Sequence, residues 1–437
     1  MSYLFNGNVN VLNEVEVKND TGEPLAVEVV NAEPISVNLD NPISFGAAAT
    51  DAFGRLRVSN PFTLFDSQHR YSENDKWSTS LTGSGEKLYN ANASLVIMRV
   101  GTASGDEVVR ESKRVMAYQP GKSLLIFSTF QLSTPKTNLR QRVGYFSSTN
   151  GIYLQVNNTT VSFVLRGSSS GSLLETVVNK SSWNYDRLDG TGPSGYTITD
   201  FSNSMILFFD MEWLGVGDVR CGFVLNGQFI VCHIFKNTPA GGSPISDTYM
   251  TTACLPLRLE ITNTGVTASS SDLKHICNSV ISEAGYDLTS TSFHQNIGTT
   301  ELRLSDADVP MPVISLRLSS SRLDSIIILK SLSIVLASNQ ILLYEIRLNP
   351  TLTDPDWNNH SCLSVDYDLS ATAVTGGTTI AAGYIDKAGG IQLGSTTDFN
   401  FQLGRTLAGV SDIISLVCTP TSGNTDVFAD LGWYKII

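Results

Sequence analysis

The 437-residue sequence predicts an all-β protein built around a β-sandwich. Short β-branched or aromatic runs, roughly 5–10 residues each, recur between Gly, Ser, Asn or Pro, and this punctuation is typical of a sandwich or barrel. Two such runs flank Asn226-Gly227, a pair that tolerates the positive φ values of a two-residue hairpin turn. The composition, 41% hydrophobic and 16% charged, fits a folded chain with a polar but lightly charged surface.

The runs on either side of Asn226-Gly227 carry the clearest secondary-structure signal. Residues 219–225 and 228–235 are rich in Val, Phe and Ile, and we interpret them as paired antiparallel strands. In the first run every second residue is apolar, so one face of the strand is consistently apolar. That face is predicted to pack on a second sheet.

Residues 1–50 differ from the rest of the chain. Apolar residues alternate with polar ones in short runs separated by turn sequences. Strands of this kind cannot bury enough apolar surface alone. We therefore predict an N-terminal β arm for anchoring or oligomerisation, which pairs with copies of itself or with another protein. The residues assigned to this pairing are Val15, Val17, Leu25, Val27 and Val29.

Residues 51–285 are predicted to form the central sandwich domain. One segment is ambiguous, since Leu273, Ile276 and Cys277 belong to a helix-like spacing although its length and surroundings suit a core strand, and we favour the strand. Asn157-Asn158 is a further candidate hairpin turn. The other predicted strands of this domain are residues 62–67, 94–100, 108–116, 123–132, 141–147, 152–156, 160–166, 204–210 and 257–263.

Residues 286–437 repeat the style in a smaller C-terminal β domain. Pro350 and Pro355 mark breaks between its strands. The last residues, around Trp433, are apolar enough to dock rather than fray. The predicted strands are residues 313–318, 325–336, 340–349, 361–366, 390–393 and 413–419.

Charge and composition exclude several classes of function. The net charge of −12 argues against nucleic-acid binding, because that affinity comes mainly from Lys and Arg neutralising phosphates. Neither a signal peptide nor an apolar run long enough to span a membrane is present, so we expect a soluble chain made in the cytoplasm without membrane insertion. The six cysteines show no paired spacing and the five histidines no ligand spacing, so no metal site is predicted.

Catalytic signatures are weak. Gly121-Lys122-Ser123 ends like a phosphate-binding loop, but the required earlier glycine is replaced by Met116, so a turn is favoured. Ser67 and His69 would share one face of a strand while Asp66 points away, which does not make a triad. Paired aspartates in loops are most simply solvated turn residues. We therefore predict no enzymatic activity and no cofactor.

One polar loop combines aromatic and acidic residues. Trp183 and Tyr185 lie there beside Asp186 and Asp189, ahead of a Gly-rich segment. An aromatic ring in such a loop can stack on a sugar or anchor a neighbouring subunit, although core packing is an open alternative. The two aspartates with nearby carbonyls could hold calcium, but the spacing matches no EF-hand. These four residues are the candidate partner or glycan contacts.

Four stretches resemble a family of virion structural proteins from tailed bacteriophages, especially phages of marine bacteria and cyanobacteria. The similarity covers roughly residues 10–285. The hairpin at Asn226-Gly227 is also similar to a strand pair of lectin-like jelly rolls such as galectin or laminin-G modules, which implies a lectin-like central sandwich. The four stretches are residues 50–71 (TDAFGRLRVSNPFTLFDSQHRY), 188–195 (LDGTGPSG), 212–223 (EWLGVGDVRCGF) and 276–285 (ICNSVISEAG).

The resemblance implies a structural component of a phage virion, in the tail, baseplate or fibre. Such a protein is made in the host cytoplasm and localised to the virion, where it would assemble through its N-terminal arm, as a homotrimer and with other virion proteins. Alternatives are a capsid or neck decoration protein, or a receptor-binding protein for host surface glycan. A glycan-cleaving tailspike is the least favoured, because no β-helix repeat is present. The family supplies no catalytic residues for this chain.

Overall fold

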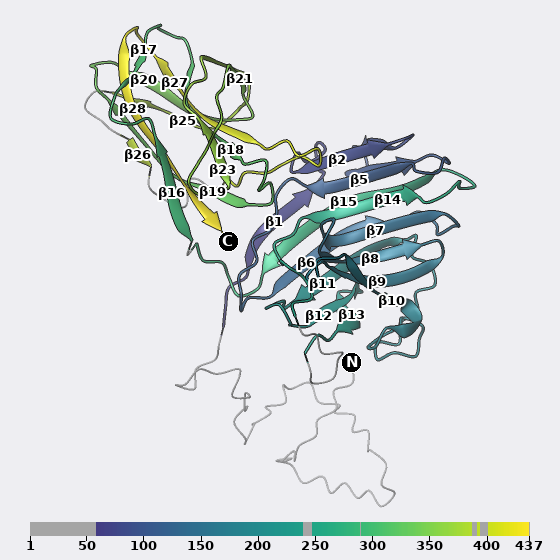
Figure 1. Cartoon of the computed structure of the whole chain (residues 1–437). Helices are drawn as coiled ribbons and strands as arrows, with labels where there is room; N and C mark the ends of the chain where they lie inside the picture. Colours follow the sequence, from purple (N-terminus) through teal and green to yellow (C-terminus); the bar gives the residue numbers. More distant parts are fainter. Residues whose placement is uncertain (1–57, 239–246, 289, 387–390, 394–400, 437) are drawn as a thin grey trace, which may run out of the picture. The chain divides into compact units, whose positions relative to one another are not determined.

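The computed structural model describes residues 58–238, 247–288, 290–386, 391–393 and 401–436 (Figure 1). Contacts within the chain separate Met1–Val58 from a second unit, Ser59–Ile437. In the described residues regular structure is almost entirely antiparallel β, with one turn of 3-10 helix at Lys180–Ser182, so the predicted fold class is confirmed. This part of the chain contains no helix with the length and apolarity needed to span a membrane. The predicted arm strands lie outside it.

An eight-stranded sheet forms one layer of the N-terminal half of the second unit. Its order is β13-β12-β11-β6-β15-β4-β3, and β1 pairs with β15 beside this path. The strands are β1 (Phe62–Gln68), β3 (Glu86–Asn90), β4 (Leu95–Val100), β6 (Leu124–Gln131), β11 (Ser204–Met211), β12 (Val219–Leu225), β13 (Gln228–Phe235) and β15 (Ser271–Ser282).

A seven-stranded sheet forms the other layer, in the order β10-β9-β8-β7-β14-β5-β2. Figure 1 shows β9, β8, β7, β14, β5 and β2 side by side in that sequence. The strands are β2 (Trp77–Thr82), β5 (Glu107–Ser112), β7 (Leu139–Phe146), β8 (Gly151–Asn157), β9 (Thr160–Gly167), β10 (Leu174–Asn179) and β14 (Leu257–Asn263).

One hydrophobic core fills the space between these two sheets. Alternate residues of each strand point inward, so β6 contributes Leu124, Ile126 and Phe130 while β8 contributes Ile152 and Leu154. All five are essentially inaccessible to solvent. The remaining alternate residues form the two outer faces, and these faces differ in chemistry.

The β12–β13 hairpin has the predicted bounds. Asn226 and Gly227 have φ values of 50° and 77°, as a two-residue turn of the primed type requires. The inward residues of β12, including Cys221 and Phe223, are buried, which confirms the predicted apolar face. The β8–β9 hairpin likewise turns at Asn158, with φ of 55°.

Residues 271–282 form one strand, β15, and a β-bulge explains their helix-like spacing. The register with β6 shifts between His275 and Cys277, so burial alternates up to His275 and resumes one residue out of phase at Asn278. The same point divides the other edge of β15, where β4 pairs with the residues before the bulge and β1 with those after it. The extra residue of the bulge shifts the two-residue alternation by one position, and the apolar residues are then spaced as they would be in a helix.

The C-terminal half of the second unit contains a five-stranded and a six-stranded sheet. The five-stranded sheet has the path β16-β28-β19-β26, with β17 also paired to β28, and the six-stranded sheet has the order β22-β23-β18-β27-β20-β25. The predicted strand at residues 361–366 forms only from Val365 onward. The strands are β16 (Thr291–Asn296), β17 (Leu302–Leu304), β19 (Ile326–Leu336), β26 (Ile391–Leu393) and β28 (Thr425–Ile436), then β18 (Met311–Leu318), β20 (Leu342–Leu348), β22 (Asn358–Asn359), β23 (Val365–Asp368), β25 (Thr378–Ile385) and β27 (Ile413–Pro420), with a separate pair β21 (Thr351–Thr353) and β24 (Ala373–Thr375).

A second hydrophobic core lies in this C-terminal half. It includes the fully buried Trp433 of β28, so the prediction that these last residues are docked is confirmed. A small apolar cluster, formed by Val115, Ala117 and Ile326, joins the two halves. Arg405 adds an ion pair across the same junction, at 2.6 Å from Glu111. The domain boundaries at residues 50 and 285 stay predictions.

Candidate functional site

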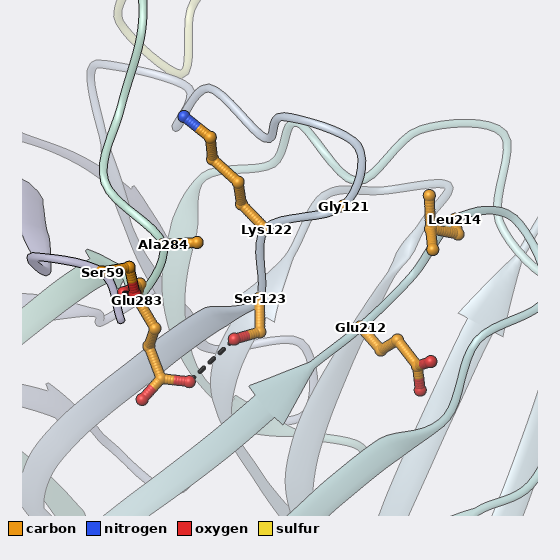
Figure 2. Close-up of a pocket in the computed structure, with 8 residues that line it drawn as sticks. All are labelled: Ser59, Gly121, Lys122, Ser123, Glu212, Leu214, Glu283 and Ala284. Atoms are coloured by element: carbon orange, nitrogen blue, oxygen red, sulfur yellow. Dashed lines mark hydrogen bonds between the residues drawn. The ribbon is translucent and has the colours of Figure 1, made fainter. Parts of the chain in front are cut away.

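An open hollow of about 350 Å³ lies at one end of the eight-stranded sheet (Figure 2). Its residues come from the chain just before β1, from the turn before β6, from the turn after β11 and from the end of β15. Strand ends meet here because β11, β6 and β15 are neighbours in the sheet. The lining residues are Ser59, Gly121, Lys122, Ser123, Glu212, Leu214, Glu283 and Ala284.

Three of the four stretches that resemble phage virion proteins meet at this hollow. Ser59 belongs to the stretch 50–71, Glu212 and Leu214 to the stretch 212–223, and Glu283 and Ala284 to the stretch 276–285. These stretches are far apart in sequence. Their convergence on one surface feature makes the hollow the candidate functional site.

The rim of the hollow is a strained turn. Trp213, Leu214 and Gly215 all have positive φ values, 39°, 46° and 83°, and such a conformation is unfavourable for a bulky residue such as Leu. The Tyr118 hydroxyl fixes the turn, since it donates to the Glu212 carbonyl at 2.7 Å and accepts from the Leu214 amide at 3.2 Å. The turn holds the Leu214 side chain 52% exposed, where a partner could cover it.

Carboxylates dominate the chemistry of the hollow. Glu283 accepts a hydrogen bond from the Ser123 hydroxyl at 2.8 Å, which Figure 2 shows as a dashed line. Glu212 accepts from the Asp218 amide at 3.1 Å. Beside them, burial raises the pKa of Asp210, and the negative charge of Glu283 adds to that rise while Arg220 opposes it.

Lys122 does not neutralise these carboxylates. Its side chain points away from Glu283 and Glu212 in Figure 2. The ammonium group donates instead to Asp287 and Gln119, at 2.6 and 2.9 Å. The residues around Gly121, with φ of 84°, form a turn and no phosphate cradle, in agreement with the sequence analysis. The hollow is therefore acidic, and it suits a polar or cationic partner better than a phosphate.

Trp183, the first of the predicted contact residues, lies in the core of the sandwich. It is 2% exposed and stacks on Phe163, with the ring centroids 4.6 Å apart. Its indole nitrogen donates to the Val178 carbonyl at 3.2 Å. The core-packing alternative therefore describes Trp183 in this structure, because a ring so placed cannot stack on a ligand. Tyr185 is 55% exposed, and its role as a contact stays a prediction.

Asp186 and Asp189 organise the Gly-rich loop. The buried Asp186 carboxylate accepts from the Leu188 and Ser194 amides, at 2.8 and 2.9 Å, and a side chain at Gly192 would collide with it. Although burial acts in the opposite direction, these hydrogen bonds lower the pKa of Asp186. Asp189, exposed, caps the turn at Thr191. In the described residues no group of three His, Cys, Asp or Glu side chains is placed to hold a metal ion.

The residues Asp66, Ser67 and His69 are arranged as the strand period predicts. Ser67 and His69 are buried together while Asp66 is exposed. Ser67 accepts from the Trp77 indole at 2.7 Å, and His69 Nε2 lies 3.4 Å from His275 Nδ1. These side chains belong to a packed network and not to a triad.

Two sets of residues on the outer faces of the sandwich were missed in the sequence analysis. The first set, on the seven-stranded sheet, is named the polar face. Its ion pairs include Arg258 with Glu111 and Arg166 with Glu175, at 2.6 and 2.7 Å. Alternation of charged and apolar residues in β5, β7 and β14 could have revealed it. The polar face consists of Glu111, Arg140, Arg142, Phe146, Tyr153, Arg166, Glu175, Arg258 and Glu260.

The second set, on the eight-stranded sheet, is named the aromatic face. The ring of Phe229 lies 5.0 Å from that of Phe208 and 5.7 Å from that of Phe127, measured between centroids. Phe229 is 54% exposed and the neighbouring Ile206 is 39% exposed. The aromatic face consists of Phe127, Ile206, Phe208, Val224 and Phe229.

Comparison with known proteins gives structural neighbours only. No protein-family model and no curated protein sequence matches the chain. The carbohydrate recognition domain of Emp47p has 9% sequence identity and a TM-score of 0.33, over 53% of this chain and 99% of that one. The CBM2 module of the evolved Dit of Lactobacillus casei BL23 phage J-1 has 6% identity and a TM-score of 0.33, over 53% of this chain and 99% of that one.

Enzymes are also among the similar structures. The Bacillus licheniformis β-glucanase has 12% identity and a TM-score of 0.29, over 52% of this chain and 99% of that one. Two further glucanases and the Crh5 transglycosylase are similar at comparable levels. This finding contradicts the prediction that the chain is not an enzyme, which rested on weak catalytic signatures in the sequence. At such low identity the likeness concerns the fold alone.

Proposed function

We propose that this chain is a structural component of a bacteriophage virion, in the tail, baseplate or fibre, and that it assembles through its N-terminal arm. The observation that carries the proposal is the convergence of three phage-like sequence stretches on the hollow. Ser59, the first residue of the compact unit, is one of the lining residues. A capsid or neck decoration protein is the alternative location.

Two features support assembly as the role of the hollow. The strained turn keeps Leu214 exposed beside the polar side chains of the hollow, and exposed apolar residues of this kind anchor protein–protein contacts. The neighbouring Glu212 and Glu283 supply negative charge that orients a partner. The expected partners are further copies of the chain, as a homotrimer, and other virion proteins.

The first experiment is to measure the mass of the full-length protein by light scattering and to compare it with a protein that lacks residues 1–50. A trimer that falls to a monomer without the arm supports self-assembly. Monomers in both samples would shift the proposal to a decoration or adaptor protein whose arm needs a different virion protein. Particles that incorporate the shortened protein at the normal level would contradict an anchoring arm.

A substitution at the hollow tests the site itself. Leu214→Asp should weaken incorporation into particles while the fold is retained, because Asp tolerates positive φ better than Leu. Val266→Asp is the matched control, since Val266 is 71% exposed in the loop between β14 and β15. Equal incorporation of the two variants would remove the hollow from the proposal.

Recognition of a host surface glycan is the second candidate function. It is favoured by the polar face, whose arginines and carboxylates line a sheet surface, and by the exposed ring of Tyr185. Tyr185→Ala should lower binding to host cells if the ring contacts the glycan. Trp183→Ala would report on core packing instead, because Trp183 is buried.

A further inference from the structure

One arginine of the polar face has no carboxylate partner among the described residues. Arg258, Arg166 and Arg142 each have a carboxylate partner, at 2.6, 2.7 and 3.4 Å. Arg140, on the same face of β7, has no carboxylate within ion-pair distance in the part of the chain that the structure describes. A half-buried guanidinium without a carboxylate is costly unless something else supplies the charge.

The hydrogen bonds of Arg140 are also incomplete. Its Nε atom is buried and has no partner among the described residues. Its terminal amino group reaches the Thr262 hydroxyl only at 3.4 Å. That hydroxyl in turn donates to the Glu107 carboxylate at 2.9 Å, so Thr262 lies between Arg140 and Glu107. Burial and the positive charge of Arg142 lower the pKa of Arg140, while the negative charges of Glu260 and Glu107 oppose that shift.

Arg142 adds a second guanidinium two residues along the same strand. It donates to the Gln155 side chain at 2.8 Å and lies at the long distance of 3.4 Å from Glu260. Two adjacent arginines repel each other and together attract an anion. The cross-strand neighbours of Arg140, Asn157 and Thr262, bring neutral polar side chains to the same row.

From this arrangement we propose that the Arg140–Arg142 end of the polar face binds the carboxylate of an acidic sugar, such as a uronate. A guanidinium presents a planar fork that matches a carboxylate, and Asn157 and Thr262 can bond sugar hydroxyls. The proposal rests on the second candidate function, glycan recognition, and names its substrate class. It does not depend on assembly into a virion.

The test measures binding of full-length protein to polygalacturonate oligosaccharides by calorimetry, with the methyl-esterified form of the same oligosaccharides as the uncharged probe. We expect the ester to bind at least tenfold more weakly. Arg140→Gln should weaken binding of the acidic form at least tenfold. Arg220→Gln should leave it unchanged, because Arg220 is an exposed arginine on the other sheet. Binding should also weaken as salt is added, since the contact is between charges.

Glu107→Gln gives an independent check. It keeps a hydrogen-bond acceptor for Thr262 but removes one of the negative charges that act on Arg140, so the acidic oligosaccharide should bind more tightly, by about twofold or more. Equal binding of acid and ester, or equal binding by wild type and Arg140→Gln, would overturn the carboxylate site while leaving glycan recognition in place. Binding of neither probe would overturn the site, and glycan recognition would then be judged by the host-cell assay with Tyr185→Ala.

Discussion

The two outer faces of the N-terminal sandwich differ in how they shield their aromatic rings from solvent. Each face carries aromatic rings that the core does not bury. On the polar face Phe146 and Tyr153 are inaccessible to solvent, because Arg166 lies over both rings, at 5.6 and 5.0 Å from their centroids. On the aromatic face no arginine covers Phe229 among the described residues, and the ring is 54% exposed.

The difference shows that a sheet can bury its second face without a third layer of secondary structure. The arginine guanidinium groups lie over the rings and also pair with carboxylates, as Arg258 does with Phe146 and with the buried Glu111. This solution depends on charge balance, which fails locally at Arg140. The aromatic face avoids that requirement but leaves apolar area for a partner to cover.

The largest expected effect tests the burial difference directly. Phe146→Ala should lower the free energy of unfolding by about 3–5 kcal/mol, as for other fully buried Phe residues. Phe229→Ala, the matched change on the aromatic face, should cost less than about 0.5 kcal/mol. Urea denaturation of both variants gives the two values. Similar losses in the two variants would mean that the faces are buried alike.

The next effect tests the ion pairs of the polar face. Glu111 is 2% exposed and serves both Arg258 and Arg405. Glu111→Ala should lower the free energy of unfolding by about 2–4 kcal/mol. This loss is slightly smaller than is usual for breaking a buried ion pair, because Arg258 keeps Glu260 as a partner. Arg220→Ala removes an exposed pair from the other sheet and should cost about 1 kcal/mol or less. A cost for Glu111→Ala as small as that control would refute a stabilising role for the network.

A third prediction concerns the polar groups between the two sheets. Hydrogen bonds run from the Asn74 amide to His69, from His69 to His275, and from His275 to the Asn278 side chain, so both imidazoles must be neutral. Burial, aided by the charge of Arg110, lowers the pKa of His69 to about 4, and the same two causes lower the pKa of His275 well below its ordinary value.

Because these pKa values are lower in the folded than in the unfolded protein, the unfolded state binds more protons between pH 6.5 and about 4. Stability from this network should therefore be complete above pH 6.5 and fall as the pH falls through that window. His69→Gln should flatten the dependence, measured as unfolding free energy against pH. A slope in the variant equal to that of the wild type would assign the acid sensitivity to other groups.

The smallest effect on the free energy of unfolding is expected at Arg140, which has no carboxylate partner among the described residues. Arg140→Met should change the unfolding free energy by less than about 1 kcal/mol and could raise it, because it removes a buried cation that has no carboxylate partner. Arg258→Met, the paired counterpart, should be clearly destabilising. Comparable losses in both would show that Arg140 is paired in solution.

A strong turn signal allowed some strands to be predicted, including the edge strand β13, while edge strands without such a signal were missed. The hairpin at Asn226-Gly227 was predicted with its true bounds, because a local turn signal and a period of two coincide there. In the sandwich, β2, β3 and β10 were missed, and all three lie at sheet edges. Edge strands have only one neighbour and need little apolar alternation, so their sequences look like loops.

The candidate site was less predictable than the fold. The aromatic and acidic residues near Trp183 attracted attention as a composition, but which of them is buried depends on the distant Phe163. The hollow depends on strand order, which brings Ser59 next to Glu283 although they are far apart in sequence. No local pattern encodes that proximity.

The pairing of β1 with β15 has a consequence for how the chain folds. β1 pairs with no other strand of the eight-stranded sheet, and Phe62 lies opposite Ser282, so about 220 residues separate the partners. At a synthesis rate of ~5–20 residues per second, β1 waits about 10–45 s on the ribosome before its partner emerges. Loop closure over such a distance is slow, and the apolar side of β1, including Phe65, stays open to chaperones meanwhile. We therefore expect β1, the first strand of the sandwich, to be among the last strands to pair.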